Sequence, residues 1–233
     1  MNMENEKSTF VKAQTDMLSL VMRQVYLRMF LALLVTAITA YYVAVTPAVT
    51  QFVFGSRVVF WILIIAEFGL VIGLSAALHK MSTTTANVMF LLYAILNGVT
   101  LSSIFFVYQL GSIAFTFFIT AGVFLAMSIY GYVTKKDLNT FGSYCVMGLF
   151  GIIIATLVNL FVHSSTLEWI VSFIGVGIFM GLTAWDTQKI KESAYAIEPS
   201  GVGKLAVIGA LSLYLDFINM FLYLLRFFGN SRN

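Results

Sequence analysis

Long runs of apolar residues, separated by short polar segments, make up most of the chain. A helix needs about 17–25 mostly apolar residues to cross a hydrocarbon layer of roughly 30 Å. Seven runs reach this length: 29–45, 58–78, 86–108, 113–133, 144–162, 167–185 and 205–228. Each run is continuously apolar rather than alternating, which favours helices over the short strands of a membrane barrel. The pattern predicts an all-α integral membrane protein, a seven-transmembrane-helix bundle.

The amino-acid composition leads to the same class. Hydrophobic residues are 60% of the 233 and charged residues only 10%, whereas soluble proteins average about 45–50% and about 25%. A soluble domain could not bury so much apolar surface. The single cysteine, Cys145, lies in the fifth run and excludes an intrachain disulfide. The predicted surroundings are the lipid bilayer, and no nucleic-acid partner is expected.

The first 28 residues differ from the rest of the chain because they are polar and carry both charge signs. They are too long and too acidic for a secretory signal. Their apolar residues recur at helical spacing, so the segment either lies along the membrane interface or extends the first span. We therefore divide the chain into a polar, interfacial amino-terminal segment, 1–28, and a membrane domain, 29–233. Among the connections, only 186–204 is long enough for an independent feature.

Basic residues fall unevenly on the two sides of the seven spans. Ten of the 13 lysines and arginines lie on the amino-terminal side, and Arg57, Arg226 and Arg232 lie on the other. The positive-inside rule then places the amino terminus in the cytoplasm and the carboxyl terminus opposite. If the last run is re-entrant, the carboxyl terminus returns to the cytoplasmic side.

Acidic residues within spans need a reason, because a charge at the bilayer centre costs about 2.5–3.5 kcal/mol. Asp216 has apolar sequence on both sides and shares one helical stripe with polar residues, so this stripe should face other helices or a water-filled cavity. The last helix is therefore expected to be central. The acidic candidates are Glu67, Asp186 and Asp216, and the polar residues on the stripe are Ser212, Asn219 and Tyr223.

Asp186 directly follows the sixth run, and Lys189 and Lys191 come soon after it, so it fits either a solvated surface position or a site. At about 1.5 Å per residue, Asp186 falls near the membrane edge and Asp216 near the midplane, roughly 10 Å apart. The offset shrinks if the embedded part of the last helix begins near Leu211. Two adjacent carboxylates would then share a proton, titrate as a unit and offer oxygen ligands to a cation such as Ca²⁺. Such a pair is a pH-sensitive gate.

Other polar and small residues have simpler interpretations. Glu67 either lines the same cavity or is hydrogen-bonded within the bundle, and Asn97 is expected to form an interhelical hydrogen bond. Two glycine pairs follow the small-xxx-small pattern of close helix packing, Gly69 with Gly73 and Gly177 with Gly181. His79 and His163 fall at opposite surfaces and predict no shared metal site.

The sequence resembles the transmembrane Bax inhibitor motif family over most of its length. The most specific match is ALSLYLDFINMFLYLLRFFG at 210–229. Supporting matches are AEFGLVIGLS around Glu67, TKKDLNTFGSY at 134–144 and WDTQKIK at 185–191. The resemblance implies a bacterial inner (plasma) membrane protein with a bundle of seven helices, of which the last is central.

The resemblance also implies a function: a pH-sensitive leak of Ca²⁺, with the aspartate pair mapping to Asp186 and Asp216. Ca²⁺ would be the permeant ion, bound transiently, and no cofactor is expected. Family members place a basic residue at the inner end of span two as a latch for the aspartates. Here that stretch reads ALHKMSTTT and offers His79 or Lys80 instead of arginine. Eukaryotic relatives are associated with suppression of cell death and bacterial ones with modulation of a membrane protease.

Two other functions compete with the leak. Presenilin-like intramembrane proteases also carry aspartates on spans six and seven, but in a Gly-x-Gly-Asp motif, whereas Asp216 follows Leu213, Tyr214 and Leu215. Zinc and serine hydrolase motifs are absent, so we expect no enzyme. The remaining alternative is a non-transporting regulator that binds another membrane protein through its helices.

Overall fold

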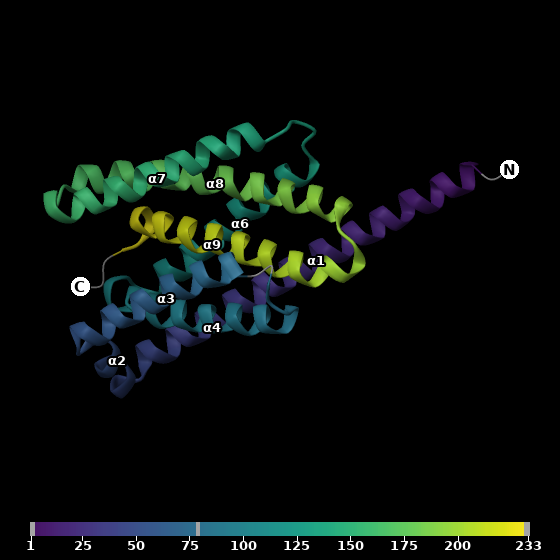
Figure 1. The fold of residues 1–233 in the computed structure, drawn as a ribbon. Coiled ribbons are helices and arrows are strands. Elements are labelled where there is room, and N and C mark those ends of the chain that lie inside the picture. Colours follow the sequence, from purple (N-terminus) through teal and green to yellow (C-terminus); the bar gives the residue numbers. More distant parts are fainter. Residues whose placement is uncertain (1–2, 78–79, 231–233) are drawn as a thin grey trace. The chain divides into compact units, whose positions relative to one another are not determined.

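The computed structural model describes residues 3–77 and 80–230, with side chains described from residue 12 onward (Figure 1). These residues form helices and no strands. The helices are α1 (Met3–Val45), α2 (Pro47–Phe54), α3 (Arg57–Ala77), α4 (Thr83–Leu101), α5 (Ile104–Val107), α6 (Leu110–Val133), α7 (Asn139–Val162), α8 (Ser165–Ala196), the 3₁₀ turn η2 (Pro199–Gly201) and α9 (Val202–Phe228).

Seven segments within the described residues are long and apolar enough to cross a membrane, which confirms the predicted helical class. They include the whole of α3, α6, α7 and α8, most of α1, a span that joins α4 to α5, and a last span containing α9. Burial differs widely among them. Within one apolar 18-residue window of each span, 72% of the residues are buried in the last span, 44% in α8 and only 6% in α3. The last helix is thus the heavily buried one, as the polar stripe around Asp216 predicted.

The chain forms two compact units. The first contains the residues up to Ser103 together with Lys189–Leu211, and the second contains Ile104–Gln188 together with the residues from Ser212 onward. Helices α8 and α9 therefore contribute to both units.

In the first unit, α1 is one continuous helix that passes residue 28 without a break. Its apolar residues near the start, Leu18, Val21 and Val25, are buried rather than spread over a lipid surface. Further along, α1 contacts α4 closely: the Thr36 hydroxyl donates to the Ala94 carbonyl at 2.9 Å. A Cβ on Gly98 would lie 2.7 Å from the Thr36 carbonyl oxygen, so only glycine permits this approach.

The close helix packing predicted at the two glycine pairs is absent at three of the four described positions. A Cβ at Gly69, Gly73 or Gly177 would meet no described atom within 4 Å, whereas one at Gly181 would lie 2.6 Å from the Cys145 sulfur. The first pair lies on α3, which is the least buried of the seven spans among the described residues. Close packing falls instead on single glycines that meet a backbone or a ring.

The prediction of a long polar connection at 186–204 is also wrong, because most of these residues are helical. Helix α8 continues ten residues beyond Asp186, to Ala196, and α9 begins at Val202. Thr187, Ile190 and Ala194 are buried in this stretch, and their spacing of three and four residues forms one helical stripe. The charged residues between them conceal this stripe in the sequence. Only 197–201 remains as a connection between the two helices.

Candidate functional site

Asp216 lies near the middle of α9 in the second unit, among large apolar side chains. It is 4% exposed, and its neighbours Leu213 and Tyr214 are fully buried. Phe217, next to it, packs against Phe117 with ring centroids 5.3 Å apart. The Oδ2 atom of Asp216 is buried and has no hydrogen-bond partner among the described residues. An ionised carboxylate without a partner is expensive in such surroundings.

Asp186 lies on α8 and is half-buried. Its carboxylate and that of Asp216 are close enough for their charges to interact. The register of the two helices explains this proximity. The rings of Phe179 on α8 and Tyr223 on α9 stack with centroids 5.9 Å apart. Asp186 lies seven residues after Phe179, and Asp216 lies seven residues before Tyr223, so each is about two turns from this contact in the same direction in space. The antiparallel helices therefore carry both aspartates at one level, and the offset expected from the sequence disappears.

The segment of α8 around Asp186 is fixed by hydrogen bonds to the connection between α6 and α7. Gln188 accepts from the backbone N–H of Leu138 at 2.8 Å and donates to the carbonyl of Lys136 at 2.8 Å. Trp185 donates its indole N–H to the Asn139 side chain at 3.0 Å. Asp186 is thus bracketed by two residues that tie its helix to residues 136–139.

Close packing reinforces these bonds. A Cβ on Gly131 of α6 would overlap the backbone of Ala184, and one on Gly142 of α7 would overlap the Trp185 ring. Helices α7 and α8 run side by side in Figure 1. A main-chain contact cannot rearrange as a side-chain contact can, so the α8 turn that carries Asp186 is held rigidly.

The other polar residues of the α9 stripe have contacts of their own. The Asn219 amide donates to the Leu215 carbonyl of the same helix at 2.8 Å. Tyr223 lies under the Arg226 guanidinium, 5.3 Å from the ring centroid. Ser212 is half-buried.

Glu67 lies in the first unit, on α3, and both its carboxylate oxygens accept hydrogen bonds. The Asn97 amide donates to one oxygen, and the Thr100 hydroxyl donates to the other at 2.9 Å. The interhelical hydrogen bond expected for Asn97 is therefore confirmed. Of the two interpretations left open for Glu67, the structure shows the hydrogen-bonded one, a link between α3 and α4.

The family comparison covers nearly all of the chain. Residues 18–233 match the model of the family described as inhibitor of apoptosis-promoting Bax1. The chain belongs to this Bax inhibitor family. It is 51% identical over 214 residues to the inner membrane protein YbhL of Escherichia coli strain K12, covering 91% of this chain and 92% of that protein. It is 50% identical over 207 residues to an uncharacterized protein of Borreliella burgdorferi, covering 88% and 89%.

The stretches that carry the Bax inhibitor resemblance contact one another in the structure. Gln188 and Trp185 of WDTQKIK bind Lys136, Leu138 and Asn139 of TKKDLNTFGSY. Sequence reasoning did not single out Gln188 or Trp185. The only available signal was their place beside Asp186 in a matching stretch.

The candidate latch and metal sites are the remaining predicted features. Lys80 is exposed, and His79 lies outside the described residues. Within the described part of the chain, no three histidine, cysteine or acidic side chains gather as a metal site would require. Within the second unit, the carboxylates of Asp186 and Asp216 lie close enough to interact.

Proposed function

We propose that this Bax inhibitor family member is a pH-sensitive Ca²⁺ leak channel, in which Asp186 and Asp216 share a proton and transiently bind the ion. One observation carries the proposal: a buried Asp216 oxygen lacks a hydrogen-bond partner among the described residues while a second carboxylate lies within electrostatic reach. Two interacting carboxylates in a poorly solvated site titrate as a pair. Protonated, the pair joins α8 to α9 by a hydrogen bond, and deprotonated, it repels itself or recruits a cation.

The chemistry of the pair suits a permeant ion. Ca²⁺ takes six to eight oxygen ligands, and two carboxylates supply only part of that set, so water must complete it. An ion held this loosely leaves readily, as conduction requires. Ca²⁺ and protons are therefore substrates of the site, and no resident cofactor is part of the proposal.

The same site argues against proteolysis. An intramembrane aspartyl protease has to admit an extended substrate backbone beside its aspartates. Here the two glycine positions of that motif hold Leu213, which is 0% exposed, and Leu215, which is half-buried. Glycine would leave room for a substrate at such positions, whereas these side chains fill it. The function that we propose is therefore that of a channel without enzymatic activity.

The proposed location is a bacterial inner membrane with the amino terminus in the cytoplasm. It is supported by the E. coli relative, which is an inner membrane protein, and by the uneven distribution of lysines and arginines. A reporter fused to Asn233 tests the orientation: a cytoplasmic signal would contradict seven full crossings.

The leak is tested with full-length protein in liposomes that contain a Ca²⁺ indicator, across a range of pH. Wild-type protein should give Ca²⁺ flux that changes with pH. Asn resembles a protonated Asp. At every pH, Asp186→Asn and Asp216→Asn should therefore each show the flux that the wild-type protein shows at low pH. Glu192→Gln is the matched control, because Glu192 is an exposed carboxylate on the same helix as Asp186. It should retain the wild-type pH profile.

Two outcomes contradict the proposal. Flux that is absent at every pH excludes a leak, and regulation of a partner by such a protein would support the non-transporting alternative. Wild-type pH profiles in both Asn variants leave a leak but remove the aspartates as its sensor.

A further inference from the structure

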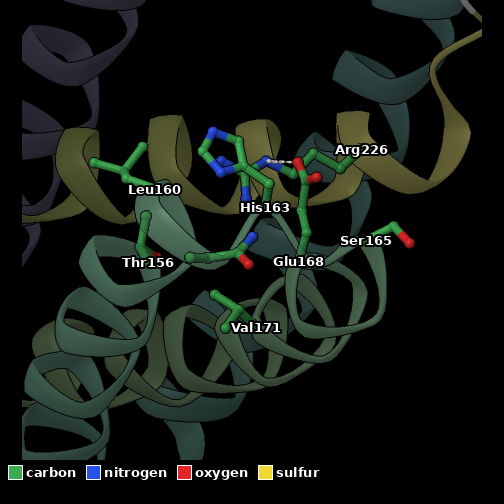
Figure 2. A pocket seen from close by; sticks show the side chains of 8 residues that line it. Thr156, Leu160, His163, Ser165, Glu168, Val171 and Arg226 are labelled. Atoms are coloured by element: carbon green, nitrogen blue, oxygen red, sulfur yellow. Dashed lines mark ion pairs between the residues drawn. The ribbon is translucent and has the colours of Figure 1, made fainter.

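A cavity of about 350 Å³ with several polar side chains in its wall lies in the second unit, where α7 ends, α8 begins and α9 ends (Figure 2). Its wall includes His163, Glu168 and Arg226. His163 caps α7 in a left-handed conformation with φ 52°, Glu168 lies in the first turn of α8 and Arg226 in the last turn of α9. The volume falls within the range of about 300–1,000 Å³ typical of small-ligand sites.

The two charged groups in this cavity are only loosely engaged with each other. Arg226 Nε lies 4.0 Å from the Glu168 carboxylate, and Arg226 Nη1 lies 3.4 Å from the Ser172 hydroxyl. Both distances exceed the roughly 2.7–2.9 Å of a strong charge-assisted hydrogen bond. A guanidinium has five N–H donors, and this side chain is 37% exposed. Arg226 therefore retains both the access and the hydrogen-bonding capacity to bind a ligand.

A second hollow of about 200 Å³ shares Glu168 and Arg226 with the first and adds Trp169 and Phe227. The two rings lie edge to face, 5.7 Å apart. Trp169 is 59% exposed and Phe161, at the end of α7, is 86% exposed. Exposed aromatic side chains at the ends of membrane helices are typical of the headgroup region of a bilayer. The charged pair thus lies beside the lipid boundary.

We propose that this cavity binds the headgroup of an ethanolamine phospholipid. Arg226 takes the phosphate, for which a planar guanidinium offers paired donors, and Glu168 takes the primary ammonium, which has three N–H donors. A bare anion would be repelled by Glu168 and a bare cation by Arg226. A trimethylammonium group has no N–H to donate. Only a zwitterion with a primary amine satisfies both residues, and the aromatic flank favours a lipid over a soluble molecule.

Native mass spectrometry of the detergent-purified full chain tests the proposal without any flux measurement. The probes are dioleoyl phosphatidylethanolamine, phosphatidylglycerol and phosphatidylcholine, together with free phosphoethanolamine. Wild-type protein should bind the ethanolamine lipid about tenfold more tightly than the other two lipids, and free phosphoethanolamine should not displace it at equal concentration.

Variants separate the two halves of the site. Arg226→Gln should weaken the binding of phosphatidylethanolamine and of phosphatidylglycerol alike, by about tenfold. Glu168→Gln should abolish the preference for phosphatidylethanolamine while retaining the binding of phosphatidylglycerol. Arg57→Gln is the control, because Arg57 is an exposed arginine on α3 that does not line the cavity.

Three results would overturn the proposal. They are equal affinities for the three lipids in wild-type protein, the same affinities in Arg226→Gln as in Arg57→Gln, and displacement of the lipid by free phosphoethanolamine. The last would identify a soluble ligand. None of these results bears on the aspartate pair, so the proposed leak stands or fails separately.

Discussion

Glu67 and Asp216 are both acidic residues in the middle of apolar helices, yet their surroundings are opposite. Glu67 belongs to the least buried span, 6% buried, and both its oxygens accept hydrogen bonds from α4. Asp216 belongs to the most buried span, 72% buried, and its Oδ2 atom has no hydrogen-bond partner among the described residues. The more deeply buried carboxylate is therefore the less satisfied one.

This difference distinguishes an acid that links two helices from one that is a candidate sensor. A carboxylate with both oxygens hydrogen-bonded stabilises the contact between its helices. A buried carboxylate without a full set of partners must gain a proton or a cation, so its surroundings respond to pH or to ions. Hydrogen-bond satisfaction, rather than depth in the membrane, identifies the candidate sensor.

The largest expected effect concerns flux. Asp216→Asn should abolish the pH dependence of Ca²⁺ flux in liposomes, because an amide cannot titrate. Glu67→Gln should retain it, because an amide can still pair with Asn97 and Thr100. Measuring both variants over the same pH range tests the distinction. Loss of pH dependence in Glu67→Gln alone would reverse the two roles.

The next effect concerns the rigid setting of Asp186. Gly131→Ala should lower the free energy of unfolding by about 3 kcal/mol, since the new methyl group overlaps the backbone of Ala184. Gly122→Ala is the control on the same helix, where a Cβ would meet no described atom within 4 Å. Denaturation in mixed micelles measures both variants. Equal stabilities would show that α6 and α8 are not held together at Gly131.

A smaller effect should come from the Glu67 hydrogen bonds. Glu67→Ala leaves the Asn97 amide without its acceptor and should cost about 1–2 kcal/mol of unfolding free energy. Combined with Asn97→Ala, the loss should be less than the sum of the single losses, because each change removes the same hydrogen bond between Asn97 and Glu67. Fully additive losses would mean that this bond does not stabilise the protein.

The smallest effect has the opposite sign. Gly69→Ala should raise the unfolding free energy by about 0.5 kcal/mol, because alanine favours helix and a Cβ there would meet no described atom within 4 Å. Gly98→Ala, on the closely packed α4, should instead destabilise the protein. If Gly69→Ala is the more damaging of the two, α3 has a close neighbour at Gly69.

The sequence was sufficient for the seven spans and for the heavy burial of the last helix around Asp216, because apolar length and an isolated charge are local signals. It was insufficient where contacts are long-range. The hydrogen bonds from Gln188 to Lys136 and Leu138 connect residues about 50 positions apart. The residue types alone do not indicate which partner each one binds. The continuation of α8 was hidden because its buried stripe lies between charged residues. The Arg226 cavity depends on three helix ends meeting, which no periodicity reveals.

The length of α8 determines on which side of the membrane the proposed pair would sense pH. Its 32 residues extend for about 48 Å, well beyond a hydrocarbon layer of roughly 30 Å. Counted from Ser165, Asp186 lies about 31 Å along this helix, close to the far boundary of the layer. Protons would then reach the proposed pair by a short route from the compartment facing the α8–α9 connection, and by a long one from the other. The sensor would report the pH of a single compartment, independently of the gradient across the membrane.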